Sequence, residues 1–251
     1  MIRAIFACAL GAAFGINVPA HQYGQVILDA GTHKAGVPAV AFDHWRHRAR
    51  FTCRLCHVDV GFAMERGATH ISASTNRDGF HCGACHNGKT EFEGKAIFAA
   101  CSGSPTLEES CRRCHGGGSD KSREEHAALQ LPRGSFGEVD WEQAEAQGKV
   151  RPLDVLAGVS IPRRALKMDR DVRIESHGAW MTDVKFSHKK HAIWNGCEVC
   201  HPEIFPSTKA GPVKFTMFQI AEGLACGACH GKVAFPLAYC DRCHTRPVQF
   251  P

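Results

Sequence analysis

The sequence of 251 residues has no long apolar run after its first twenty residues. A helix that crosses a membrane needs about 20 consecutive apolar residues. The early run from Ala4 to Val18 is shorter than that, and no later stretch is long or apolar enough. The sequence therefore favours a chain without a membrane-spanning helix, and a retained N-terminal anchor is the less favoured alternative.

The N-terminus is typical of a secretory signal. It has a short basic start at Arg3, a brief apolar stretch and small residues up to Ala20. We predict that residues 1–20 form a signal peptide, cleaved after Ala20, and that Cys8 leaves with it. The mature chain is then expected to be exported, soluble and periplasmic.

Cysteine, by contrast, occurs in a fixed pattern. The motif Cys-x-x-Cys-His occurs six times and uses twelve of the fourteen cysteines. This is the attachment signature of c-type haem, in which two thiols bond to the haem vinyl groups and the histidine binds iron on the proximal side. Structural zinc and disulfides are the alternatives, but neither needs a histidine directly after every second cysteine. We predict six covalent haem c groups at Cys53, Cys56 and His57; Cys82, Cys85 and His86; Cys111, Cys114 and His115; Cys197, Cys200 and His201; Cys226, Cys229 and His230; and Cys240, Cys243 and His244.

Six haems would leave little polypeptide for an ordinary apolar core. The share is roughly 40 residues per haem, below the size at which a domain is stable without staples or cofactors. The 25 glycines and 12 prolines also favour loops. We therefore predict a mostly irregular, haem-packed fold with short α-helices that carry the attachment motifs.

The chain has only a small excess of charge. Its formal net charge is +5, which counts the polypeptide alone. A ferric haem with two histidine ligands and two ionised propionates carries about −1, so six of them bring the protein close to neutral. No nucleic-acid partner is expected, and we interpret the basic residues Arg46, Arg48 and Arg50 as propionate partners or solvated surface.

The sequence repeats itself at a constant offset of 144 residues. His44, Cys53 and Cys82 reappear in the same context as His188, Cys197 and Cys226. Such regularity indicates duplicated structural units. We predict an N-terminal triheme domain at residues 21–135, a linker or strap at 136–175 and a C-terminal triheme domain at 176–251. One short helix is expected in the strap, capped by Asp140 and ended by Gly148.

Each half also carries a Phe-x-His-x-x-His element upstream of its first motif. Phe42 precedes His44 and His47 in the first half, and Phe186 precedes the equivalent pair in the second. Histidines three residues apart share one face of a helix. Two such histidines can reach two adjacent haems, so we predict that they bind iron on the distal side.

This element, followed by three attachment motifs, resembles the triheme periplasmic cytochromes of the class III type, the cytochrome c7-like domains. The resemblance covers residues 40–115 and 184–244, and it implies two triheme domains in tandem. It also implies which distal histidine serves each haem. The implied pairs are His44 with His57, His47 with His86, His188 with His201, and His191 with His230.

The third haem of each half is less well defined by the sequence. The resemblance implies a ligand upstream of the second motif. In the first half we choose His70 for the haem on His115, with His81 as the alternative. The second half has no histidine in that stretch, so Met217 is the predicted ligand for the haem on His244. Core packing is the alternative role of Met217.

One loop of the first half departs from the repeat. The stretch from Cys82 to Cys111 is fifteen residues longer than its counterpart and contains Cys101. A free buried thiol is the favoured interpretation of Cys101, and intermolecular pairing or haem attachment together with Cys114 are the alternatives. Four further histidines have no assigned role and are expected mainly at the surface: His21, His33, His126 and His177.

The resemblance implies an electron carrier and no enzymatic activity. Its expected partners are redox proteins, with a quinol-oxidising membrane complex upstream and a reductase or outer-membrane conduit downstream. Membrane association would occur only through partners or an uncleaved signal. The alternatives are a multihaem reductase with one open haem site, or a subunit of a cytochrome polymer or membrane-associated redox complex.

Overall fold

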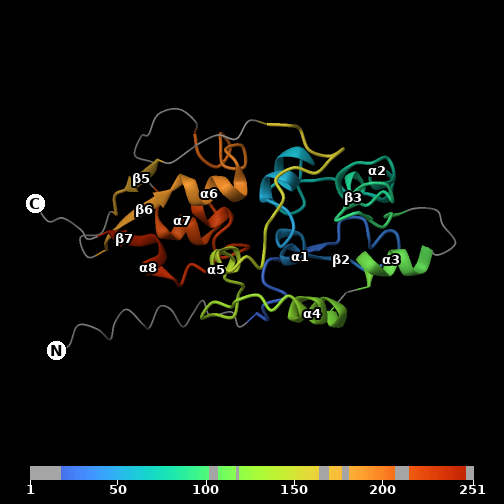
Figure 1. Ribbon diagram of the computed structural model, residues 1–251, viewed down its shortest axis with the longest axis horizontal. Coiled ribbons are helices and arrows are strands. Elements are labelled where there is room, and N and C mark those ends of the chain that lie inside the picture. The colour runs from blue at the N-terminus through green and yellow to red at the C-terminus, as the bar shows by residue number, and fades with distance from the viewer. Residues whose placement is uncertain are drawn as a thin grey trace, which may run out of the picture.

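The computed structural model describes residues 18–101, 107–116, 119–163, 170–176, 181–206 and 215–246. Most of the predicted signal peptide lies outside these residues. The two halves lie side by side along the longest axis, with the C-terminal half on the left in Figure 1. The longest described helix has ten residues and the longest strand five, which confirms the predicted loop-rich fold with short helices. No helix in these ranges is both long and apolar enough to cross a membrane.

The N-terminal half combines short helical segments with two small antiparallel sheets. Strand β1 pairs with β2 so that Val26 lies opposite Phe42, and helix α1 begins directly after β2. The elements are β1 (Gln25–Leu28), β2 (Val40–Asp43), α1 (His44–Arg48), η2 (Leu55–Asp59), α2 (Ala73–Arg77), η3 (His81–Ala84), β3 (Glu91–Phe92), β4 (Lys95–Ala96) and α3 (Leu107–His115).

The C-terminal half has one three-stranded antiparallel sheet in the order β5-β6-β7. Its elements are β5 (Asp171–Ile174), β6 (Asp183–Ser187), α6 (His188–Asn195), α7 (Met217–Ala221), η4 (Ala225–Ala228), α8 (Cys240–Cys243) and β7 (His244–Arg246). Strand β5 lies in the predicted strap but pairs along its whole length with β6. The predicted domain start at residue 176 therefore falls just after a strand that belongs to this sheet.

The sequence repeat is also a repeat of local structure. In both halves a strand leads directly into the helix that carries the His-x-x-His element, as β2–α1 and β6–α6. Ser72 and Thr216 cap α2 and α7 with reciprocal side-chain and backbone hydrogen bonds, the capping-box arrangement. His81 and Ala225, each directly before a motif cysteine, have φ angles of +49° and +51°.

Two helices, and not one, lie between the halves. The predicted helix is α5 (Trp141–Ala146), where the Asp140 side chain accepts a 3.0 Å hydrogen bond from the Gln143 backbone N–H. A second helix, α4 (Ser119–Ala128), precedes it inside the predicted N-terminal domain and was not predicted. The sequence does not indicate α4 because the helix buries polar residues, Ser122 and His126. It therefore lacks the periodic apolar residues by which an amphipathic helix is recognised.

The segment between the halves supplies much of the apolar core. Its residues pack against one tryptophan from each half, Trp45 of α1 and Trp194 of α6, and Figure 1 shows α5 between the two halves. The buried cluster consists of Trp45, Leu131, Val139, Trp141, Ala144, Val150 and Trp194. The strap is therefore an ordered part of the interface between the halves.

Candidate haem-binding sites

Most of the predicted iron-binding histidines share one hydrogen bond. In seven of them Nδ1 lies 2.6–2.9 Å from a backbone carbonyl oxygen. A carbonyl oxygen only accepts, so Nδ1 carries the proton and Nε2 keeps its lone pair for a metal ion. The pairs of histidine and carbonyl are His44 and Gly24, His57 and Phe62, His115 and Pro38, His188 and Arg170, His191 and Ser187, His201 and Phe205, and His244 and Thr182. The Nδ1 atoms of His47, His86 and His230 are buried without a hydrogen-bond partner among the described residues.

The phenylalanine of each Phe-x-His-x-x-His element holds both histidine rings. The Phe42 ring lies edge-on to His44 at 4.9 Å and stacks on His47 at 4.6 Å between ring centres. Phe186 makes the same two contacts in the second half, at 4.9 and 4.3 Å. A strand residue thus fixes the orientation of two imidazoles on the following helix.

Two predicted distal histidines face their predicted proximal partners. The ring centres of His47 and His86 are 6.3 Å apart, and those of His191 and His230 are 6.2 Å apart. An imidazole nitrogen binds a transition metal at about 2 Å, so two rings on opposite sides of one metal ion have centres about 6 Å apart. The spacing in both halves is therefore that of two histidines that share one iron.

Both of these facing pairs are neutral at physiological pH. Burial lowers the pKa of His47 to about 3, and the neighbouring His86 lowers it further. Burial and the neighbouring His191 lower the pKa of His230 to about 4 in the same way. Neutral imidazole is the form that binds metal ions, so the site holds its ligands ready at neutral pH.

A second aromatic residue supports each of these sites and was not predicted. Phe98 lies 4.4 Å from the His86 ring centre, and Phe235 lies 4.2 Å from that of His230. The guanidinium of Arg113 covers Phe98 at 4.7 Å, as that of Arg242 covers Phe235 at 4.4 Å. Both arginines occupy the third position of the third attachment motif, which is the sequence signal that could have revealed the contact.

Attachment cysteines of different motifs lie near one another in the N-terminal half. Burial raises the pKa of the Cys56 thiol to about 12, and the neighbouring thiol of Cys85 is the next largest cause. Burial also raises the pKa of Cys82 to about 11, and Cys114 of the third motif is the next largest cause. Thiols of different motifs in this half are therefore close enough to raise one another's pKa.

The same is true across the interface between the halves. Burial raises the pKa of Cys229 to about 12, and Cys53 of the other half is the next cause. Cys53 also raises the pKa of Cys200, and Cys226 raises that of Cys243. The first attachment site of the N-terminal half thus adjoins the first two sites of the C-terminal half.

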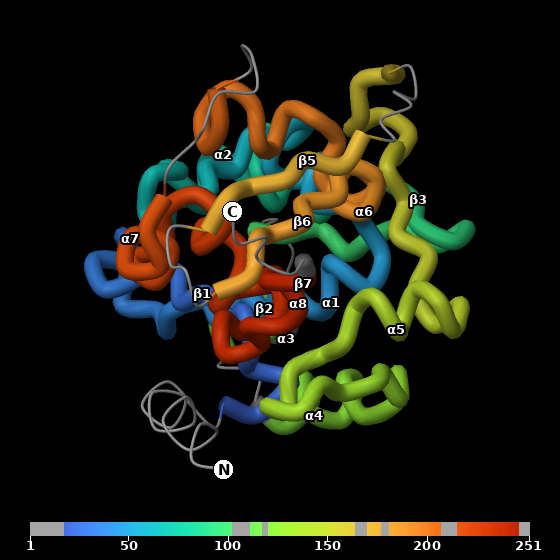
Figure 2. The backbone as a smooth tube through the Cα atoms, turned by 90° about the vertical axis from the view of Figure 1, so that its left-hand side faces the viewer, coloured from blue at the N-terminus to red at the C-terminus, as the bar shows by residue number. Residues whose placement is uncertain are grey.

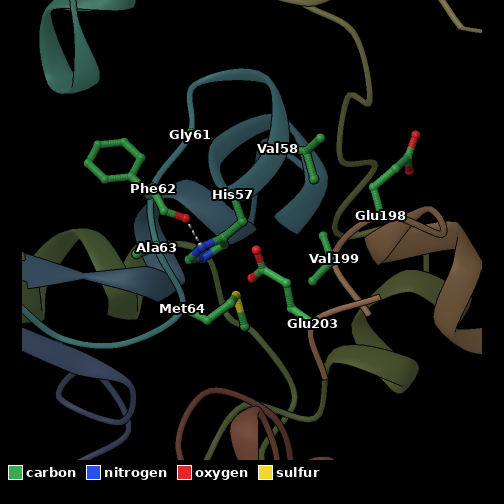
Figure 3. Close-up of a pocket in the computed structure, with 9 residues that line it drawn as sticks. All are labelled: His57, Val58, Gly61, Phe62, Ala63, Met64, Glu198, Val199 and Glu203. Carbon is green, nitrogen blue, oxygen red and sulfur yellow. Dashed lines mark hydrogen bonds between the residues drawn. The ribbon is translucent and has the colours of Figure 1, made fainter. Parts of the chain in front are cut away.

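A cavity of about 390 Å³ lies beside the first motif and is lined by both halves. Figure 3 shows the His57 ring in the lining, with the Glu203 carboxylate pointing toward it, Met64 below it, and the hydrogen bond from Nδ1 to the Phe62 carbonyl. A second cavity of about 340 Å³ is lined by His81 and Asp59, among others. His57 and the alternative ligand His81 therefore each border a cavity.

The structure leaves the third haem of each half with less defined distal ligands. His70 is exposed, in the loop before α2. The Nδ1 atom of His81 is buried and has no hydrogen-bond partner among the described residues. Met217 is 53% exposed at the start of α7, so its side chain is not part of the hydrophobic core formed by the polypeptide. These three assignments stay predictions, as does the role of Cys101, whose neighbours are Cys82 and Cys114.

The basic run of α1 is not simply solvated surface. Arg48 is half-buried, with its Nε atom inside the fold, and burial lowers the pKa of its guanidinium, which stacks on Trp141 at 4.6 Å and Trp194 at 4.9 Å. It also donates to the carbonyl of Val233 in the other half. Arg46 forms a 3.0 Å ion pair with Glu125 of α4. The interpretation as solvated surface is therefore wrong for Arg48, which joins the two halves.

The residues around the motifs fit a large apolar group with a metal at its centre. Phe80 and Leu224 occupy equivalent positions before the second motif of each half and are 62% and 52% exposed. Phe218, beside Met217, is 72% exposed. Exposed apolar side chains in repeat-equivalent places indicate a binding surface. Together with paired thiols and imidazoles that keep Nε2 free, they match covalent haem.

These features define a multihaem c-type cytochrome, in which paired cysteines hold haem c and histidines bind its iron. The sequence also matches the model of the family described as cytochrome c7 and related cytochrome c, over residues 40–116 and 184–245. The two segments make up more than half of the chain. The chain therefore belongs to this family, and the predicted family resemblance is confirmed.

Solved multihaem cytochromes are similar to the chain at low identity. The C-terminal hexahaem fragment of GSU1996 is 24% identical, with 88% of this chain and 96% of that chain covered and a TM-score of 0.27. The dodecahaem cytochrome c GSU1996 is 24% identical, with 88% and 74% covered and a TM-score of 0.27. No curated protein sequence matches the chain. Membership of the family rests on the sequence match, since these TM-scores are too low for a comparison of folds.

Proposed function

We propose that the chain is a periplasmic hexahaem cytochrome that carries electrons between redox proteins. The observation that supports this most strongly is geometric: His47 faces His86 with ring centres 6.3 Å apart, and His191 faces His230 with ring centres 6.2 Å apart. Two imidazoles at this spacing can close one iron on both sides, which suits an electron carrier more than a site that binds substrate.

The side chains around each motif would hold the cofactor rigidly. When bound, haem supplies an iron that accepts and releases one electron, with a potential set by axial ligands, burial and nearby charge. Phe42 and Phe186 keep the distal imidazoles in place through ring contacts. Carbonyl acceptors such as that of Phe62 keep Nδ1 protonated in seven of the predicted ligands, which would leave Nε2 of these histidines to bind the iron.

The proposed partners follow from the family. A quinol-oxidising membrane complex would supply electrons, and a reductase or an outer-membrane conduit would receive them. The export of the chain would rest on the signal peptide at residues 1–20, with cleavage after Ala20. The six proposed haems are those of the six motifs, with distal ligands as paired above.

The experiment combines intact mass with carbon monoxide binding. We expect the exported protein to exceed the mass of the cleaved polypeptide by six haem masses, and the ferrous protein to show no spectral change with carbon monoxide. Three or fewer haems would contradict the hexahaem proposal, and a seventh would implicate Cys101. A carbon monoxide adduct would reveal an open iron and favour the multihaem reductase.

A further inference from the structure

Two histidines without a role in haem binding face each other near the start of the described chain. The ring centres of His21 and His126 are 6.4 Å apart, with an angle of 58° between the ring planes. The two predicted iron-sharing pairs have ring centres 6.3 and 6.2 Å apart, at 70° and 63°. The third pair therefore has the spacing of two imidazoles that share a metal ion, although no attachment motif lies beside it.

His126 presents a buried nitrogen that the polypeptide leaves unused. The residue is only 4% exposed, and its Nε2 atom has no hydrogen-bond partner among the described residues. The edge of the Trp45 ring packs against it at 5.0 Å between centres. An unpaired polar atom in the interior costs free energy, so a ligand that takes up this nitrogen is favoured.

A third nitrogen arises if the signal peptide is removed after Ala20. His21 then becomes the first residue, and its α-amino group and ring can close a chelate on one metal ion. Tyr23, two residues further on, donates its hydroxyl to the Ala234 carbonyl at 2.7 Å, so the chain next to His21 keeps an anchor when residues 1–20 are removed. Both views place the start of the described chain beside α4, which carries His126 (Figures 1 and 2).

We propose that the mature protein binds one copper(II) ion through the α-amino group and ring of His21 together with Nε2 of His126. The inference rests on the export and cleavage included in the proposed function. Among the described residues no three side chains of His, Cys, Asp or Glu converge on a metal site, so the amino group is the necessary third ligand. An all-nitrogen donor set with two imidazoles suits copper, which also binds most tightly among the divalent first-row metals.

The site would lie next to the haem ligands. Trp45, which touches His126, is flanked in α1 by the predicted distal ligands His44 and His47. Ser122 of α4 donates a 2.5 Å hydrogen bond to Asp43, directly before α1. The helix that carries His126 is therefore anchored to the strand and helix that carry these ligands.

The test uses exported holoprotein, mixed with copper(II) and separated from excess metal by gel filtration. We expect N-terminal sequencing to begin at His21, metal analysis to give one copper per chain, and calorimetry to report tight binding. His126→Ala should weaken binding more than about 100-fold, beyond the loss caused by removing a supporting residue. Insertion of Gly-Ser between Ala20 and His21 should weaken copper binding similarly, and it changes no buried side chain.

The control is His33→Ala, at an exposed histidine, which should bind copper like the wild type.

A different N-terminus, the absence of retained copper, or unchanged affinity in either of the first two variants would overturn the proposal. Haem content and reduction by dithionite should be the same in all four proteins, which separates this test from that of electron transfer. A deficit of haem in the wild type would contradict the proposed function, whereas loss of copper alone contradicts only this inference.

Discussion

The two halves are most alike in the geometry around the histidines that are expected to bind iron, and they differ in the length of the loops nearby. The facing histidine pairs have nearly the same spacing, 6.3 Å in the first half and 6.2 Å in the second. The aromatic supports repeat as closely, with Phe98 4.4 Å from His86 and Phe235 4.2 Å from His230. The stretch that contains Phe98 is fifteen residues longer than its counterpart, yet the contact survives. The comparison indicates that the positions of the aromatic rings around the imidazoles are kept between the halves, whereas the length of the loop is not.

The halves diverge at the third haem and at the interface. Met217 of the second half corresponds, at the offset of 144, to Ala73 of the first. Arg48 contacts Val233 across the interface, whereas its counterpart is Ala192. The duplicated part therefore comprises the predicted ligands of the first two haems in each half, while the predicted ligands of the third haem and the contact between the halves are particular to each.

The largest expected effect concerns where the C-terminal half begins. A fragment of residues 170–251 retains β5, including the Arg170 carbonyl that accepts from His188 and the 2.7 Å ion pair of Asp171 with Lys185. We expect it to be soluble with three haems. A fragment of residues 176–251 lacks these contacts and should lose most of its haem, measured by haem absorbance per polypeptide. Equal loading of both fragments would show that β5 is dispensable to this half.

The next effect tests whether Arg48 joins the halves. Arg48→Met removes a guanidinium from between Trp141 and Trp194 and leaves the Val233 carbonyl without its donor. We expect the free energy of unfolding to fall by about 3 kcal/mol in denaturant titration. The matched control Arg46→Met breaks a partly exposed ion pair and should cost about 0.5 kcal/mol. Equal costs would mean that Arg48 has no special part in the interface.

A smaller effect tests the equivalence of the two Phe-x-His-x-x-His elements. Phe42→Leu and Phe186→Leu each remove ring contacts to two histidines. Each should lower the free energy of unfolding by about 1 kcal/mol, because aromatic contacts contribute on this scale beyond area burial. Each should also broaden the low-spin haem signals of its own half. A cost confined to one of the two variants would break the proposed symmetry.

The smallest effect depends on pH. Hydrogen bonding from Lys190, then from Arg242, holds the pKa of the Glu142 carboxyl below its ordinary value of 4.5, and links α5 to the C-terminal half. A lowered pKa adds stability above 4.5, and that stability disappears as pH falls through the folded-state value. The carboxyl is largely exposed, so Glu142→Gln should cost a few tenths of a kcal/mol, about 0.3, at pH 7 and less at pH 3. A cost that is constant with pH would assign the effect to packing.

The sequence predicts the repeated parts of the sites better than the contacts between distant segments. The three-residue spacing of His44 and His47, repeated at the offset of 144, was enough to predict that two histidines share one helix face. Which ring meets which was implied by the family resemblance and not by the spacing. The helix α5 was readable from Asp140 and Gly148 in the same way.

Tertiary contacts of polar residues could not be read from the sequence. Helix α4 escapes notice because Ser122 and His126 are the residues it buries, and both become internal only through Asp43 and Trp45 of another segment. The burial of Arg48 likewise depends on tryptophans that lie far from it in the chain. Local patterns determine helix faces, but they do not determine which faces meet.

Near-infrared magnetic circular dichroism of the oxidised protein tests the central claim most directly, because it distinguishes histidine from methionine ligation of ferric haem and detects high-spin iron. If every iron is closed and the halves differ at the third haem, the spectrum contains five bis-histidine haems and one histidine–methionine haem. The Met217→His variant then contains six of the first kind, with one potential lowered, since methionine ligation raises the potential. A high-spin haem in the wild type would contradict the account of a closed electron carrier, and six bis-histidine haems would contradict the role of Met217.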